Sequence, residues 1–209
     1  MPDTASVFVM EPVLEIVSCD DFALWPIASY EAYGFLPLSN RLTPDEVGLA
    51  AMRIVQCNDS DPDDDQPPRP AEPVAAFLHG LLTFDTLFAA GGLRVTDTTT
   101  GVTLVPGCCA GVEDWREWHQ VLDGDQVYLG HSPTPTAERH GDTVRLTVDA
   151  DQPDSPLIDL PADDLRRLLV GVERDLVGFH RLAADWMRRQ LPEHAAPVTA
   201  ALARVLDLH

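Results

Sequence analysis

Two adjacent cysteines, Cys108 and Cys109, are the residues of this chain with the most distinctive chemistry. The nearest histidines after them are His119, His131 and His140. Cysteine and histidine together bind zinc, but zinc sites usually space their cysteines as C-x2-C, because adjacent residues do not easily reach one tetrahedral ion. No second cysteine pair exists, and the histidines match no known ligand spacing. The glycines and alanine around the pair therefore predict a buried corner of small residues, with metal or thiol chemistry as the alternative.

A second group of ionisable side chains lies on a predicted short helix, residues 111–122. It carries Glu113, Asp114, Glu117 and His119, and paired carboxylates with a histidine could perform general acid–base catalysis. The sequence shows no nucleophile, oxyanion donors or substrate cradle to accompany them, and acids in a first helical turn ordinarily complement the helix dipole. The alternative is therefore a metal- or thiol-dependent enzyme that uses Cys108, Cys109, Glu113, Glu117 and His119. The sequence favours a protein that is not an enzyme.

The familiar cofactor and catalytic motifs are absent from the sequence. It contains no P-loop, dinucleotide-binding, nucleophile-elbow or HExxH pattern. It also contains no lysine, which excludes a P-loop lysine or a Schiff base. We therefore expect no cofactor and no bound metal.

The charge of the chain is its most pronounced global property, with 34 acids, 14 arginines and a net charge of −20. Residues 1–75 hold 14 acids and 3 arginines, residues 76–160 hold 13 and 4, and residues 161–209 hold 7 of each. Such acidity repels phosphate backbones and anionic membrane surfaces, so we expect neither nucleic acid nor a membrane as partner. The uneven distribution argues against uniform salt adaptation and indicates an acidic surface within residues 1–160.

The main functional hypothesis is therefore a protein that binds a basic protein partner. Trp115 and Trp118 lie three residues apart on the predicted helix; both can be core residues, whereas an exposed tryptophan ringed by acids would suit an arginine- or lysine-rich partner. An acidic nucleic-acid mimic is a further alternative. The expected contact residues are Glu113, Asp114, Glu117, Trp118, Asp61, Asp63, Asp64 and Asp65.

Two resemblances bear on this hypothesis. The segment VPGCCAGVEDWREW (residues 105–118), followed by LGHSP (129–133), resembles a motif of uncharacterised actinobacterial proteins. The small, acidic α+β character is similar to that of immunity proteins of polymorphic toxin systems. The second resemblance, one of general style, implies that the protein occludes a basic toxin domain, with Asp and Glu side chains standing where a phosphate substrate would lie.

The hydrophobic pattern predicts an α+β fold: β-hairpins in an antiparallel sheet, with a long C-terminal helix and a short terminal helix. We expect a single domain over residues 1–209, a flexible acidic proline-rich loop at 58–73 and a helical segment at 161–209. Few cysteines, no basic N-terminal region and no long apolar stretch favour the cytoplasm. The predicted strand regions are 6–17, 93–106 and 136–148, and the predicted helices are 44–55, 111–122, 162–190 and 197–207.

Overall fold

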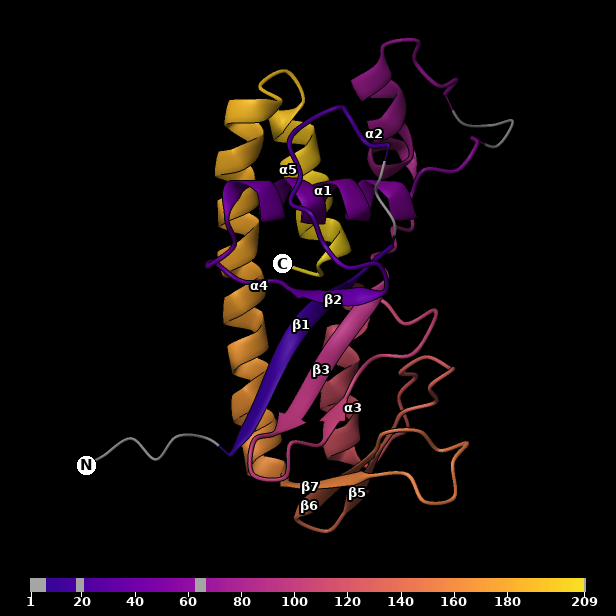
Figure 1. The fold of residues 1–209 in the computed structure, drawn as a ribbon, viewed down its shortest axis with the longest axis vertical. Helices are drawn as coiled ribbons and strands as arrows, with labels where there is room; N and C mark the ends of the chain where they lie inside the picture. Colours follow the sequence, from indigo (N-terminus) through magenta and orange to yellow (C-terminus); the bar gives the residue numbers. More distant parts are fainter. Residues whose placement is uncertain (1–6, 18–20, 63–66, 209) are drawn as a thin grey trace, which may run out of the picture. The chain divides into compact units, whose positions relative to one another are not determined.

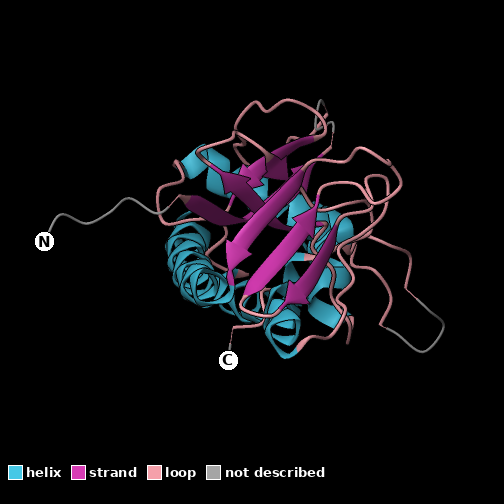
Figure 2. Cartoon of the chain, turned by 90° about the horizontal axis from the view of Figure 1, so that it is seen from below, coloured by secondary structure: helices cyan, strands magenta, loops and turns pink. Residues whose placement is uncertain are grey.

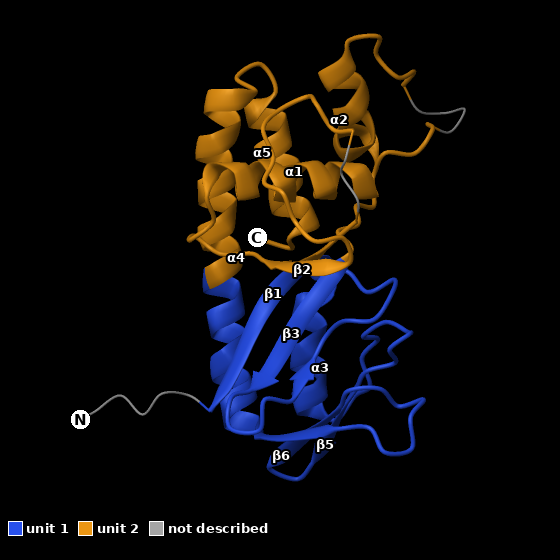
Figure 3. Ribbon diagram, in the orientation of Figure 1, with its two compact units in different colours: residues 1–13, 91–174 blue, residues 14–90, 175–209 orange. Residues whose placement is uncertain are grey.

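The computed structural model describes residues 7–17, 21–62 and 67–208 and confirms the α+β class (Figures 1 and 2). Contacts divide the chain into two compact units, residues 1–13 with 91–174 and residues 14–90 with 175–209 (Figure 3). Two compact units can belong to one domain or to two. The single domain over residues 1–209 therefore stays a prediction. The elements are β1 (Phe8–Ile16), β2 (Gly34–Pro37), α1 (Pro44–Cys57), α2 (Pro73–Thr83), β3 (Gly91–Asp97), β4 (Thr103–Leu104), the 3-10 helix η1 (Val112–Glu117), α3 (Trp118–Asp123), β5 (Thr136–His140), β6 (Thr143–Thr147), β7 (Leu157–Pro161), α4 (Ala162–Gln190) and α5 (Ala195–Val205).

The first unit contains both predicted hairpins. β3 pairs antiparallel with β4, and β5 with β6, which confirms the two turn positions inferred from the sequence. A strand that the sequence did not reveal, β7, adds to β6 in antiparallel register. Its inward residues Ile158 and Leu160 lie opposite Leu146 and Val144, and all four side chains are buried. The alternation of inward and outward residues gives this three-stranded sheet one apolar face.

The predicted helix over 111–122 forms in two parts. Its first turns are the 3-10 helix η1, and an α-helix, α3, continues from Trp118 to Asp123. Gly124, in the left-handed conformation with φ of 91°, ends it. Trp115 and Trp118 are 1% and 3% exposed, so both are core residues of this unit.

The prediction for the first strand region was wrong in one respect. Pro12 suggested an edge strand or two broken strands, whereas β1 is continuous and second in the sheet order β2-β1-β3-β4. Proline lacks the N–H that pairing with a neighbouring strand uses. Beside the short β2, at the far end of β1 from Phe8, Tyr33 N–H donates to Ile16 O at 2.6 Å. That contact does not require a donor at Pro12.

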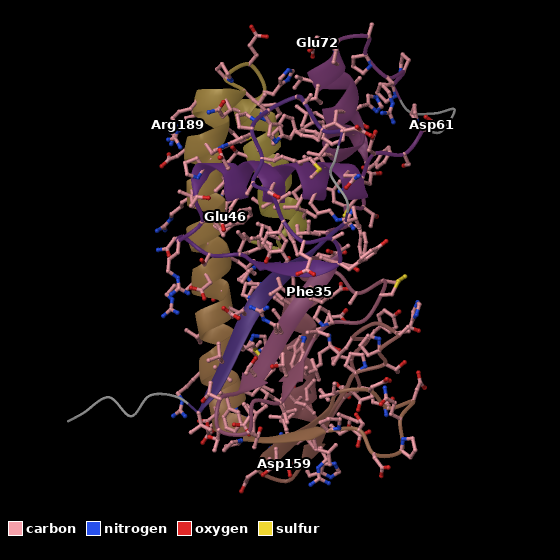
Figure 4. All side chains as sticks on the ribbon, in the orientation of Figure 1. Phe35, Glu46, Asp61, Glu72, Asp159 and Arg189 are labelled. Carbon is pink, nitrogen blue, oxygen red and sulfur yellow. The ribbon has the colours of Figure 1, made fainter. Side chains whose placement is uncertain are left out.

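In the second unit, α1 begins where the capping box predicted. The Thr43 hydroxyl accepts from Glu46 N–H, and the Glu46 carboxylate accepts from Thr43 N–H at 2.7 Å. Glu46 is labelled in Figure 4. Inside the unit, Trp25 donates from Nε1 to Gly48 O at 2.9 Å, and its ring meets that of Trp186 edge-on. These contacts hold α1 against the C-terminal part of α4.

The C-terminal helices agree closely with the sequence. α4 spans Ala162–Gln190 as predicted, with Asp163 and Asp164 in its first turn and arginines in its last. α5 begins two residues earlier than predicted. His180 Nε2 lies 3.0 Å from Thr199 O, which confirms a structural histidine with a partner. Within the described ranges, no helix is both long enough and apolar enough to cross a bilayer.

The acidic segment 58–73 is anchored at the ends that the structure describes. Arg69 forms an ion pair with Asp59 at 2.5 Å and donates to Ser60 O. Glu72 then caps α2, its carboxylate accepting from Val74 and Ala75 N–H. Residues 63–66 lie outside the described ranges, and flexibility of the segment stays a prediction.

Two helical glycines provide a test of this packing. Gly171 has space for a methyl group, so Gly171→Ala should raise the free energy of unfolding by about 0.5–1 kcal/mol through helix propensity. At Gly48 a Cβ would lie 2.1 Å from Pro26 O. Gly48→Ala should therefore destabilise the protein by about 1–3 kcal/mol despite the same propensity gain. Denaturant unfolding checks both variants, and equal effects of the two would contradict the close packing at Gly48.

Candidate metal centre

Two loops of the first unit, residues 105–111 and 127–133, are bound to each other through their backbones. Gly107 N–H donates to Leu129 O at 2.9 Å. Cys108 N–H donates to His131 O at 2.7 Å, and His131 N–H donates to Cys108 O at 3.1 Å. We call this pair of segments the loop clamp. It places Cys108 directly opposite His131, although the two are far apart in sequence.

The loop clamp depends on two glycines. A Cβ at Gly107 would lie 2.3 Å from Pro133 O, and a Cβ at Gly130 would lie 2.4 Å from the carbonyl carbon of Gly107. Gly130 also has φ of 96°, a backbone conformation that other residues rarely adopt. Any side chain at either position would force the loops apart. The close approach of the two backbones therefore requires the glycines of the segments GCC (107–109) and LGH (129–131).

The two cysteine side chains project from this clamp into solvent. Successive side chains of an extended chain point to opposite faces. Cys109 breaks that alternation because its backbone is left-handed, with φ of 67°. The two Sγ atoms lie 3.3 Å apart, and both residues are exposed. The predicted burial of the pair was wrong: Gly107, Ala110 and Gly111 are buried, but the turn at Cys109 turns both thiols outward.

His131 completes a group of three possible metal ligands. One ligand atom from each of Cys108, Cys109 and His131 lies within 4.8 Å of the others, and all three residues are exposed. Tetrahedral zinc holds two sulfurs about 3.8 Å apart and a sulfur and nitrogen about 3.6 Å apart. The sulfur spacing is already close to that value.

The helix residues proposed for catalysis or partner binding lie elsewhere in this unit. His119 is exposed on α3, with its ring centroid 6.4 Å from that of Trp115, and it does not belong to the ligand group. Glu113, Asp114 and Glu117 are half-buried. Trp118 is buried in the core and is not available to a partner, which corrects its inclusion among the contact residues.

Asp114 and Glu117 line a small cavity beside the loop clamp. Its walls include Trp115, Trp118 and Tyr128, and it encloses about 20 Å³, room for roughly one water molecule. Burial raises the pKa of the Asp114 carboxyl above its usual range. The ionised form of Asp114 is therefore destabilised by its loss of contact with water. The cavity is too small for an organic substrate.

Other acids of the first three quarters of the chain support local structure. Asp97 accepts the backbone N–H of Thr99, and Asp149 accepts that of Thr134; these hydrogen bonds lower the pKa of both carboxyls. The Arg145 guanidinium lowers the pKa of Asp159 on β7 (Figure 4), and Glu11 pairs with Arg94 at 2.6 Å. Part of the acidity is thus structural.

The predicted partner-contacting acids are divided between the two units. Asp61 is exposed in the second unit (Figure 4), whereas Glu113, Asp114 and Glu117 belong to the first. Asp63, Asp64 and Asp65 lie outside the described residues. Contact of these acids with a partner stays a prediction.

Comparisons with known proteins add no function. A scan of protein-family models and searches of curated proteins and solved structures find no match for the chain. The case for a function therefore depends on the geometry of the loop clamp and on charge.

Sequence reasoning left His131 outside the candidate site and put His119 in it. The proximity of residues 111–122 to the cysteines in sequence favoured His119. The signal that points to His131 is the glycine in each loop, Gly107 before the cysteines and Gly130 before the histidine. Paired glycines allow a close backbone approach, but no local rule says that these two meet each other.

The cost of Asp114 ionisation can be measured. A carboxyl with a raised pKa binds protons in the folded state at pH values where the unfolded chain has lost them, so stability falls as pH rises through that window. Asp114→Asn should therefore be more stable than the parent at pH 7, and the difference should shrink toward zero below about pH 3.5, near the ordinary aspartate value. Thermal unfolding at both pH values checks this. A stability loss at pH 7 larger than that of the exposed control Asp123→Asn would contradict it.

Proposed function

We propose that this protein binds a thiophilic metal ion through Cys108, Cys109 and His131. The observation that carries the proposal is the convergence of two thiols and an imidazole within 4.8 Å on the loop clamp. A clamp built from close glycine contacts supports it, because a preorganised backbone lowers the cost of bringing the ligands together. Thiolate and imidazole ligands favour zinc and other soft or borderline cations over calcium or magnesium.

The number and exposure of the ligands indicate what such a site would do. Structural zinc sites are closed by four protein ligands, whereas three ligands leave a position open for water or another molecule. All three residues here are exposed. The arrangement therefore suits exchange of the metal with another ligand, or presentation of a metal-bound water. It suits a buried structural role less well.

Metal titration tests the proposal directly. Reduced protein titrated with Cd²⁺ under anaerobic conditions should bind one ion per chain and develop an ultraviolet thiolate-to-metal charge-transfer band. Cys108→Ser and Cys109→Ser should each remove most of that band. His131→Ala should keep thiolate absorption but weaken binding about 10-fold or more, the scale on which lost metal-site interactions act.

Two matched variants control the experiment. His119→Ala removes a histidine that is close in sequence but outside the group, and Cys57→Ser removes a cysteine of α1. Both should titrate like the parent. An unchanged titration for Cys108→Ser and Cys109→Ser, or a loss of binding with Cys57→Ser, would contradict the proposed site.

The second candidate function is binding of a basic protein, such as a toxin domain that the acidic residues would occlude. The observation that favours it is the net charge of −20, concentrated in residues 1–160. Charge complementarity of this kind raises the association rate and selects the partner more than it adds affinity. Because several of these acids already stabilise turns and ion pairs, the remaining exposed ones would carry the effect.

Ionic strength distinguishes this candidate from the metal site. The association rate with a partner isolated from the native host should fall by about 10-fold or more between roughly 50 and 500 mM salt, as screening shortens the reach of the charges. Stopped-flow or surface-based kinetics would measure it. A rate that does not change with salt would contradict electrostatic steering, and it would leave the metal proposal unaffected.

A further inference from the structure

We infer that Cys108 and Cys109 form a reversible vicinal disulfide when the protein meets a hydroperoxide. The two Sγ atoms are 3.3 Å apart, so they already touch, but they lie well beyond the S–S bond length of about 2.05 Å. Both residues are exposed, which lets a small oxidant reach them. The left-handed backbone at Cys109 is what sets the two thiols on the same side of the chain.

The reaction balances with hydrogen peroxide as oxidant. One thiolate attacks the O–O bond, becomes a sulfenic acid, and releases hydroxide that is protonated to water. The neighbouring thiolate then attacks the sulfenic sulfur, an S–S bond forms, and a second water leaves. In sum two thiols lose two protons and two electrons, and one peroxide is reduced to two waters. The contact between the sulfurs favours this second step over further oxidation by another peroxide.

The geometry of adjacent residues makes this bond easy to reverse. Consecutive Cα atoms lie about 3.8 Å apart across a trans peptide, shorter than the roughly 4.4–6.8 Å that disulfides usually span. Disulfides outside their preferred geometry, and exposed ones, are more readily reduced and serve regulatory roles. A dithiol reductant should therefore restore the thiols.

Oxidation would also control the metal site, a consequence that rests on the proposed function. Two of the three ligands would be tied up in the disulfide, and a disulfide sulfur is a poor metal ligand compared with a thiolate. The loop clamp joins Cys108 and His131 through their backbone N–H and C=O groups, not through the thiols. The protein would then bind metal when reduced and release it when oxidised.

Peptide mapping of the wild-type chain tests the inference. The metal-free protein is treated with a few equivalents of hydrogen peroxide, alkylated with iodoacetamide and digested with trypsin. Cleavage after Arg94 and Arg116 gives one peptide, residues 95–116, which holds both cysteines and no other. We expect this peptide to be unalkylated and lighter by two hydrogen atoms, and to regain two alkylation sites after dithiothreitol.

Variants separate the chemistry from the metal function. Cys108→Ser and Cys109→Ser should each abolish the loss of two hydrogens and accumulate oxygen adducts or intermolecular dimers instead. His131→Ala should still form the disulfide, because the hydrogen bonds between residues 108 and 131 use only backbone atoms. The variant should bind Cd²⁺ more weakly.

The possible failures can be told apart. Sulfinic acid or linked chains in wild-type protein, in place of the internal disulfide, would overturn the inference while leaving Cd²⁺ binding by reduced protein intact. A vicinal disulfide in a protein that never binds Cd²⁺ would sustain the inference and refute the proposed function. Cd²⁺ that stays bound after complete disulfide formation would refute the coupling between the two.

Discussion

The arrangement of Cys108, Cys109 and His131 depends on the close approach of two backbones at Gly107 and Gly130. Neither residue can carry a Cβ without a contact shorter than 2.5 Å to the opposite loop. That approach allows the Cys108–His131 bridge, and the bridge fixes where the histidine stands relative to the cysteines. The left-handed turn at Cys109 then adds the second thiol. The grouping of these three side chains is thus a consequence of backbone sterics.

The sequence predicted those parts of the fold whose causes are local. The capping box at Thr43 and Glu46, the apolar stripe of α4 and the alternation in the two hairpins each depend on neighbours within a few residues. What it missed depends on tertiary context. β7 has only two inward residues and forms because β6 offers them an apolar face. The continuous β1 overrides the signal of its proline, since a missing donor matters only where a neighbouring strand would use it.

In the candidate site, too, the sequence predicted the features with local causes and missed those that depend on tertiary context. Small residues around the cysteines correctly indicated a tight, buried turn, but burial of the backbone does not settle where the thiols point. Only the sign of φ at Cys109 does so, and a cysteine gives no warning of a left-handed conformation. His119 lies outside the group of Cys108, Cys109 and His131, because sequence proximity is a weak guide to contacts made across a loop clamp. The acidity also has two origins, with carboxylates that accept backbone N–H bonds, such as those of Asp97 and Asp149, beside those that face solvent.

X-ray absorption at the metal edge of zinc-loaded, reduced protein tests the central claim most directly, because it reads the ligands themselves. The proposed site predicts two sulfurs at about 2.3 Å and one imidazole nitrogen at about 2.0–2.1 Å, with a light atom in the remaining position. The imidazole signal should vanish in His131→Ala. A coordination shell of oxygen and nitrogen alone, or a sulfur signal that persists when both Cys108 and Cys109 are serine, would contradict the account.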